Sequence, residues 1–276
     1  MDMIEKCMEN LKEKHPVVQC ITNFVTVNDC ANIVLACGGS PTMAHDRREA
    51  AEINQMCHSL VLNIGTVEDS DVEAMILAGK ESNQQGKPVI LDPVAVGASK
   101  LRRDIFDRLK QELHLDVIRG NISEIKYIAC GRGNIRGVDA GAADEVTEAN
   151  LPQVVKMAKE LAEKMDNIIV ISGRIDIVTD GKKTYILRNG HEMMSRITGT
   201  GCMSTALIGS FCGANPDALL SACTAAGADM GIAGELSFRR VEREEKGTLS
   251  FRTYLIDYVS RMTAGILREG VRIEEM

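Results

Sequence analysis

The chain has 276 residues, of which 45% are hydrophobic, and its formal net charge is -7. This length permits a substantial core in one α/β domain of ordinary size. The acidic balance, the absence of a long basic run and an aromatic content of 3% without tryptophan argue against a nucleic-acid-binding protein.

The N-terminal segment predicts an amphipathic helix rather than a signal peptide. Apolar residues recur at helical spacing between charged ones, at Ile4, Cys7, Met8 and Leu11. No continuous apolar stretch follows a basic start, as a signal peptide would require. No apolar run approaches the ~20 residues of a membrane-spanning helix. We therefore expect a cytoplasmic protein with no membrane partner.

Short apolar runs then alternate with longer amphipathic stretches. The runs are rich in β-branched residues and end in polar or glycine residues, which predicts five buried strands: Val17–Asn23, Ser59–Gly65, Lys87–Pro93, Asp116–Asn121 and Asn167–Gly173. Helical patterns lie between them: Val27–Cys37, Arg47–Cys57, Ser70–Gln84, Leu101–Leu113 and Leu151–Lys164. This alternation predicts an α/β fold with a mainly parallel central sheet, flanked by helices on both faces.

The last third of the chain changes character. Asp180 and Gly181 stand between two alternating runs, which predicts a hairpin with a tight turn. Helical patterns follow: Cys202–Cys212, Pro216–Leu236 and Leu249–Arg268. Because no linker, repeat or low-complexity segment divides the sequence, we expect a single domain over residues 1–276.

Nine cysteines are scattered along the chain, without any Cys-x-x-Cys pair. Most have apolar neighbours, so we expect reduced, buried thiols of a cytosolic protein. Clustered zinc ligands are missing from the pattern, and zinc is not expected.

Polar residues stand at the ends of the predicted strands. They are Thr22 and Asn23, Asn63 with Gly65 and Thr66, Asp92, Arg119 with Asn121, and Ser172 with Gly173. Ligands of open α/β sheets bind beyond the carboxyl ends of the strands. Helix capping or turn formation explains any one of these positions, whereas five in one chain favour a shared site. Pro93 forces an extended backbone before it, which aims Asp92 out of the sheet end.

Asn121 and Glu124 have two interpretations. Their spacing is that of a capping box at the start of the next helix. The functional alternative places them in a magnesium–phosphate network, where carboxylates hold the metal mostly through water.

The sharpest motif is Gly199-Thr200-Gly201-Cys202, directly before an apolar helix. Glycines let backbone N–H groups approach an anion, and a helix N-terminus adds free N–H groups and the positive end of its dipole. The motif therefore suits a phosphate or a phosphoryl group in transfer. It is not a Walker A sequence, and a flexible helix start remains the simpler alternative.

Cys202 lies in the first turn of that helix, where the dipole favours a reactive thiol over an inert one. A thiol enzyme with Cys202 as covalent nucleophile would need a histidine partner. The nearest in sequence, His191, lies in a Gly-His-Glu turn and is interpreted as a solvated loop residue. A non-catalytic nucleotide-binding module is a further alternative, against which the acidic strand ends argue.

Taken in order, these motifs resemble the hydroxyethylthiazole kinase family of the ribokinase-like superfamily. The matching segments run from residue 21 to about 237: Ile21-Thr22-Asn23, Gly39-Ser40-Pro41-Thr42-Met43, Asn63-Ile64-Gly65-Thr66, Leu91-Asp92-Pro93-Val94, Arg119-Gly120-Asn121 with Glu124, Ser172-Gly173 and Thr198-Gly199-Thr200-Gly201-Cys202. The resemblance implies a ribokinase-like three-layer α/β/α fold and ATP-dependent phosphorylation of 4-methyl-5-(2-hydroxyethyl)thiazole in thiamine salvage. A kinase for another small alcohol, such as hydroxymethylpyrimidine or a sugar, is the alternative within this fold.

The resemblance also implies a role for each position: substrate binding by Asn23, Met43, Gly65 and Gly199, ATP binding by Arg119, Asn121 and Ser172, Mg2+ support by Asp92 and Glu124, and a catalytic anion hole from Gly199, Thr200, Gly201 and Cys202. Cys202 fills the slot of an aspartate base in the wider superfamily. A cysteine is a weaker base than an ionised carboxylate at neutral pH, but phosphoryl transfer depends chiefly on positioning and charge stabilisation. A homotrimer with active sites at subunit boundaries is also implied.

Overall fold

The computed structural model describes residues 2–130 and 145–276. Within them, the strands form one sheet in the order β2-β1-β3-β4-β5-β6-β7-β8-β9. The strands are β1 Val17–Ile21, β2 Ser40–Thr42, β3 Ser59–Asn63, β4 Val89–Asp92, β5 Val117–Asn121, β6 Ile168–Ser172, β7 Asp176–Thr179, β8 Thr184–Leu187 and β9 Ile273–Glu275.

The sheet is parallel from β2 to β6 and antiparallel from β6 to β9. The carboxyl ends of the parallel strands therefore meet at one edge. The register places Asn63 opposite Asp92 across β3 and β4, and Asn121 opposite Ser172 across β5 and β6. Strand pairing alone thus brings four of the polar strand-end residues into two adjacent pairs.

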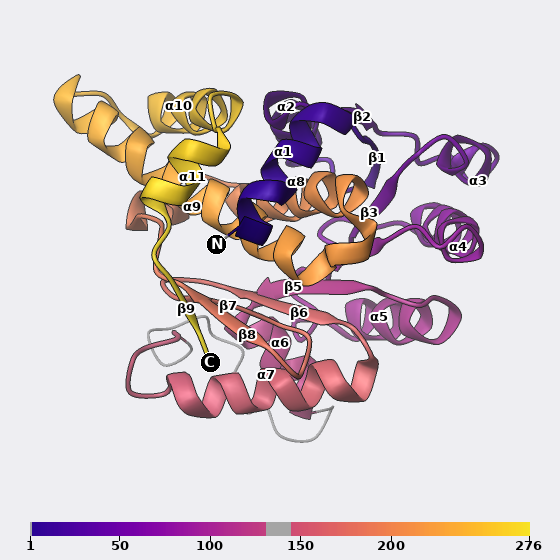
Figure 1. The fold of residues 1–276 in the computed structure, drawn as a ribbon. Helices are drawn as coiled ribbons and strands as arrows, with labels where there is room; N and C mark the ends of the chain where they lie inside the picture. Colours follow the sequence, from indigo (N-terminus) through magenta and orange to yellow (C-terminus); the bar gives the residue numbers. More distant parts are fainter. Residues whose placement is uncertain (1, 131–144) are drawn as a thin grey trace.

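Helices cover both faces of the sheet (Figure 1). One layer contains α1 Asp2–Lys14, α2 Val27–Cys37, α8 Thr200–Ala214, α9 Leu219–Arg243, α10 Thr248–Ser260 and α11 Ala264–Gly270. The other contains α3 Ala50–Asn54, α4 Asp69–Gln84, α5 Lys100–Glu112, α6 Ile122–Cys130 and α7 Leu151–Met165. Short 3-10 turns lie at η2 Glu192–Arg196 and η3 Pro216–Ala218. In the described part of the chain, no helix is long and apolar enough to cross a membrane.

Two apolar clusters hold these layers to the sheet, one on each face. Along β3 and β4, alternate residues enter opposite clusters: Val61 and Ile90 pack with the α8 layer, whereas Leu60 and Leu91 pack with the α4 layer. This alternation is the two-residue period of a strand buried on both faces. The predicted three-layer α/β/α fold is confirmed.

Most predicted elements are confirmed in type, with differences at their ends. The predicted helix Arg47–Cys57 is shorter, because the Asp46 side chain accepts a hydrogen bond from the Arg48 amide and closes a turn before α3. The predicted helix Leu249–Arg268 is two helices, α10 and α11, and the Thr263 side chain caps the second. The three-residue strands β2 and β9 were not predicted because they are too short to show alternation.

All nine cysteines are free thiols, and seven of them are buried as expected. Cys202 is half-buried, and Cys130 at the end of α6 is exposed, so the expectation of a buried thiol was wrong there. Burial raises the pKa of Cys7, Cys37 and Cys57 to about 11. These core thiols therefore stay protonated and unreactive at neutral pH.

Candidate active site

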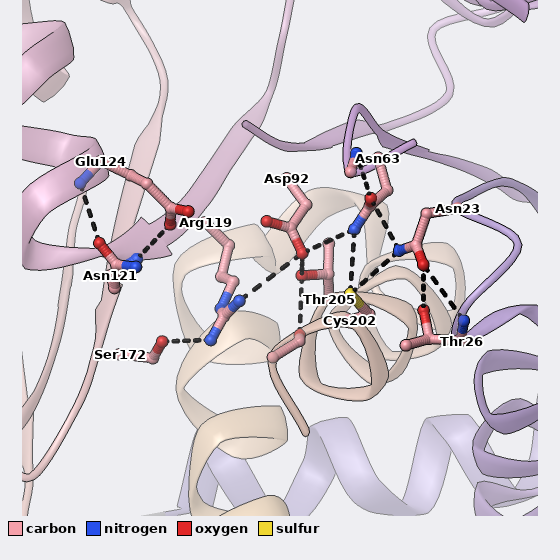
Figure 2. Close-up of polar contacts among 12 residues, drawn as sticks. Asn23, Thr26, Asn63, Asp92, Arg119, Asn121, Glu124, Ser172, Cys202 and Thr205 are labelled. Atoms are coloured by element: carbon pink, nitrogen blue, oxygen red, sulfur yellow. Dashed lines mark hydrogen bonds and ion pairs between the residues drawn. The ribbon is translucent and has the colours of Figure 1, made fainter. Parts of the chain in front are cut away.

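The polar strand ends meet the first turn of α8 at the carboxyl edge of the parallel strands (Figure 2). Asp92 lies at the centre of this group, between Arg119 on one side and Asn63 on the other. From α8, Thr205 contacts Asp92 and Cys202 contacts Asn63. Four chain segments far apart in sequence thus converge on one cluster.

Asp92 is fully buried at the end of β4. Its Oδ2 accepts hydrogen bonds from Thr205 Oγ1 at 2.8 Å and Asn63 Nδ2 at 3.0 Å, and lies 3.6 Å from Arg119 Nη1. Burial raises the pKa of the Asp92 carboxyl, and the Arg119 charge is the strongest opposing influence. Oδ1 has no hydrogen-bond partner among the described residues. A buried carboxylate oxygen in this state retains its full capacity to accept a hydrogen bond or a metal-bound water.

Arg119 is 9% exposed and links the central acid to the end of β6. Its Nη2 donates to Ser172 Oγ, so the two predicted ATP contacts lie together. A Cβ placed on Gly201 would lie 2.7 Å from Arg119 Nη1. The second glycine of the motif is therefore needed for the first turn of α8 to approach the guanidinium.

The first glycine of the motif begins α8. Gly199 is the N-cap residue with φ +89°, a conformation that favours glycine. A Cβ there would lie 2.7 Å from Thr26 Cγ2, which makes the position sterically closed to other residues. Thr200 Oγ1 donates to the Met194 carbonyl at 3.1 Å and anchors the loop. The predicted glycine-opened helix start is confirmed, and its first turn lies beside Arg119.

The Cys202 sulfur accepts hydrogen bonds from two side-chain amides. Asn23 Nδ2 and Asn63 Nδ2 each lie 3.3 Å from Sγ. The orientation of the Asn23 amide is set by Thr26, whose backbone N–H and hydroxyl both donate to Asn23 Oδ1 at 3.1 Å. The sulfur therefore occupies an acceptor position defined by β1, β3 and α8.

The histidine that a thiol enzyme would need is engaged elsewhere. The His191 ring stacks on Phe238 with centroids 3.4 Å apart, and its Nδ1 accepts from the Met193 amide. It is a packed residue at the start of η2 and not the solvated loop residue expected from sequence. Among the described residues, the side chains bonded to Cys202 are asparagines. This arrangement does not support a cysteine–histidine pair.

Asn121 and Glu124 form the capping box of α6, with reciprocal bonds of 2.8 and 2.9 Å. Glu124 Oε1 also accepts from the Ala95 amide at 2.7 Å and so joins α6 to the loop after β4. Burial raises the pKa of the Glu124 carboxyl, and the Asp92 charge adds to this effect. The structural interpretation is thus confirmed, and the charge of Asp92 also acts on this carboxylate.

Met43 lies in the wall of an open pocket of about 640 Å³ beside this cluster. Thr22 and Phe24, which flank Asn23, and Thr66, which follows Gly65, line the same pocket. The Phe24 amide donates to Thr66 Oγ1 at 3.1 Å and closes the junction between the loops after β1 and β3. This volume suits a small ligand. Of the positions predicted to bind substrate, Met43 therefore lines this pocket, and Asn23 and Gly65 are sequence neighbours of residues that do.

Gly65 is held tightly against the amide cluster. A Cβ at this position would lie 2.9 Å from Asn63 Oδ1 and 3.2 Å from Asn23 Cβ. A larger residue would thus push apart the two amides that donate to Cys202.

Two residues of the site received no role from the sequence. Thr205 donates to Asp92, and its signal was its position three residues after Cys202, on the same face of α8. Arg102 of α5 donates to the carbonyls of Ile64, Gly65 and Val94. Its position within an ordinary amphipathic helix gave no sign of this contact.

The fold places the chain in one structural class, the ribokinase-like α/β fold. A ribokinase-like superfamily protein from Enterococcus faecalis has a similar fold, with a TM-score of 0.61 over 95% of both chains at 12% sequence identity. More similar relatives narrow this class to one family.

The model of the Hydroxyethylthiazole kinase family matches residues 8–265. The hydroxyethylthiazole kinase of Clostridium acetobutylicum is 46% identical over 272 residues, covering 99% of both chains. That of Ruminiclostridium cellulolyticum is 43% identical, over 99% of this chain and 97% of the relative. The solved hydroxyethylthiazole kinase of Pyrococcus horikoshii superposes with a TM-score of 0.87 and 32% identity over both full chains. The chain belongs to the hydroxyethylthiazole kinase family.

Proposed function

We propose that this protein transfers the γ-phosphoryl group of ATP to the hydroxyl of 4-methyl-5-(2-hydroxyethyl)thiazole, a salvage step of thiamine biosynthesis. The observation that carries the proposal is the meeting of the glycine-started helix α8, the Asp92–Arg119 ion pair and the Met43 pocket. Membership of the family supports the choice of substrate.

The proposed roles of the residues are supported by their positions. The thiazole occupies the Met43 pocket with its hydroxyl toward Cys202, and Gly65 and Asn23 lie close to it. Arg119, with Ser172 and Asn121 nearby, neutralises the phosphate charge. The amides of Gly199–Cys202 stabilise the transferring phosphoryl group through the free N–H groups and the dipole of α8. Positioning and charge stabilisation supply most of the catalysis in such a reaction.

The residues at the strand ends fit Mg2+ held mainly through water and phosphate. Asp92 Oδ1 is buried without a hydrogen-bond partner in the described part of the chain, and Glu124 lies on the far side of Arg119. No group of three His, Cys, Asp or Glu side chains suited to a metal occurs among the described residues. Mg2+ keeps several waters and takes one or two carboxylates plus substrate phosphates, which matches this donor set. When bound, Mg2+ neutralises the developing charge on the phosphate oxygens.

We also propose that the chain is a single kinase domain, residues 1–276, that acts as a homotrimer in the cytoplasm. Phe24 and Val25 are 77% and 54% exposed, and Phe24 lines the Met43 pocket. A second copy packed on these apolar side chains would close the open side of the pocket. Nine free thiols support a reducing compartment.

An acceptor panel tests the proposed activity. The protein is incubated with ATP, Mg2+ and either the thiazole alcohol, hydroxymethylpyrimidine or ribose, and ADP release is measured. We expect kcat/KM for the thiazole alcohol to exceed the others by at least about 100-fold, because the pocket must select one acceptor. ADP release with another alcohol alone would reassign the substrate, and none with any of them would favour a nucleotide-binding module.

A further inference from the structure

Asn63 uses all of its hydrogen-bonding capacity inside the site. It is 1% exposed at the end of β3. Its Nδ2 donates to Asp92 Oδ2 at 3.0 Å and to Cys202 Sγ at 3.3 Å. Its Oδ1 accepts from the Gly65 amide at 2.9 Å and from Asn23 Nδ2 at 3.0 Å. A side-chain amide has two N–H donors and two acceptor positions, and every one is used.

The orientation of this amide is determined by its partners. The Gly65 backbone N–H can only donate, so the side facing it must be the Asn63 oxygen. The nitrogen then faces Asp92 and Cys202. The pairing of β3 with β4 fixes the Asn63 backbone directly opposite Asp92. Both the position and the orientation of the amide are thus set before any substrate binds.

Asn63 alone among the described residues donates to both reactive groups. The second amide on Cys202 comes from Asn23, whereas the other partners of Asp92 are Thr205 and Arg119. In the proposed function, Cys202 lies on the side of the acceptor hydroxyl and Asp92 on the side of the nucleotide. Thr205 also ties α8 to Asp92, but Asn63 is the described side chain that bonds to both groups directly.

We propose that Asn63 is a positioning residue for phosphoryl transfer, because its amide holds the Cys202 sulfur at a fixed place relative to the Asp92 carboxylate. The proposal rests on the proposed kinase function and adds a residue to it. Misplacement of a reacting group by a fraction of an ångström lowers the rate of the chemical step more than it weakens ground-state binding.

Asn63→Asp is the sharpest substitution. It keeps the shape and the oxygen that accepts from Gly65 and Asn23, but it replaces the N–H donors with an acceptor. Asn63→Ala removes the amide without adding charge. Asn215→Ala is the matched control: Asn215 is a buried asparagine that donates to the Cys7 and Phe211 carbonyls at the opposite end of α8. All variants carry Cys130→Ser, because Cys130 is the exposed thiol that would otherwise react first.

Two measurements separate positioning from a structural role. Steady-state kinetics with ATP, Mg2+ and the thiazole alcohol give kcat and both KM values. Alkylation of Cys202 by iodoacetamide, followed by peptide mass spectrometry without substrates, reports the environment of the sulfur. Circular dichroism and Tm report folding.

We expect Asn63→Asp to lower kcat by about 100-fold with KM values changed less than about threefold. Alkylation of Cys202 should slow by about tenfold, because the thiolate loses an N–H donor and gains a neighbouring carboxylate. Asn63→Ala should show the same pattern more weakly. Asn215→Ala should lower Tm and leave kcat and alkylation unchanged.

A folded Asn63→Asp variant with unchanged kcat and alkylation would overturn the proposal. So would loss of folding in both Asn63 variants, since Asn63 would then serve the fold. Slowed alkylation in a protein that phosphorylates no thiazole alcohol would instead reject the proposed function while keeping the sulfur–amide contact.

Discussion

The residues at the centre of the site differ in burial and in the hydrogen bonds they receive. Burial raises the pKa of the Asp92 carboxyl, and Arg119, Thr205 and Asn63 oppose this effect. Cys202 is half-buried and accepts hydrogen bonds from two amides. A position that receives two N–H donors suits a carboxylate oxygen as well as a sulfur.

The first prediction concerns this acceptor position. Cys202→Asp should retain kcat within about tenfold of the parent, because a carboxylate is ionised at neutral pH and can accept from both amides. Cys202→Leu should lower kcat by about 100-fold, the usual loss of a general base. Steady-state ADP release measures both. Equal inactivity of the two variants would instead favour a covalent thiol mechanism.

The second prediction concerns Asp176, at the start of β7. Its carboxyl accepts from the Gly173 amide at 2.8 Å, and burial raises the pKa of Asp176 to about 7. An unfolded aspartate has a pKa of about 4, so between these values the folded chain holds a proton that the unfolded chain has lost. The free energy of unfolding contributed by this group therefore falls as pH rises through this window.

Asp176→Asn removes this ionisation while an amide oxygen can still accept from Gly173. The gain in Tm of the variant over the parent should be larger near pH 8 than near pH 5. Scanning calorimetry at the two pH values measures it. Asp217→Asn, in the exposed turn η3, is the control. A Tm difference independent of pH would contradict the prediction.

Among the elements, helix α5 connects the two loops that border the site. The Arg102 guanidinium donates to the carbonyls of Ile64 and Gly65 after β3 and of Val94 after β4. The first loop contains Gly65, next to the pocket-lining Thr66, and the second loop follows Asp92. The Arg102 side chain thus holds the Gly65 loop and the loop after Asp92 together.

Arg102→Met should raise the KM for the thiazole alcohol by about fivefold or more, because three part-buried carbonyls lose their donor and the Gly65 loop relaxes. Arg108→Met on the same helix is the control. Arg108 forms solvent-exposed pairs with Glu73 and Glu112, which contribute little. Initial rates over a range of acceptor concentrations decide the matter; equal KM values in both variants would reject the coupling.

The sequence predicted the elements well where local signals are strong. The strands β3 to β6 are short apolar runs buried on both faces, and the polar or glycine residues that follow each run locate its end. The capping box at Asn121 marked the start of α6. By contrast, the bond between Thr205 and Asp92 depends on how α8 packs against β4, and the contacts of Arg102 depend on where α5 lies over the loops. Such long-range contacts leave no periodic pattern.

At the scale of the whole molecule, the proposed homotrimer can be tested at the exposed apolar border of the open pocket. Phe24→Asp should weaken a homotrimer, because a charge would be buried at the contact. Light scattering after gel filtration should give three times the 30.0 kDa chain mass for the parent and less for the variant. Activity of the variant should rise with protein concentration. A monomeric parent with full activity would reject the trimer.

The described sheet ends on each side in a strand of only three residues, β2 and β9. Pro41 in the middle of β2 has no N–H to donate, and β9 carries two glutamates. Such short edge strands expose few unpaired N–H and C=O groups with which a strand of another molecule could pair. In the proposed homotrimer, copies meet through side chains around the pocket, while these two border strands resist the edge-to-edge growth that leads to fibrils.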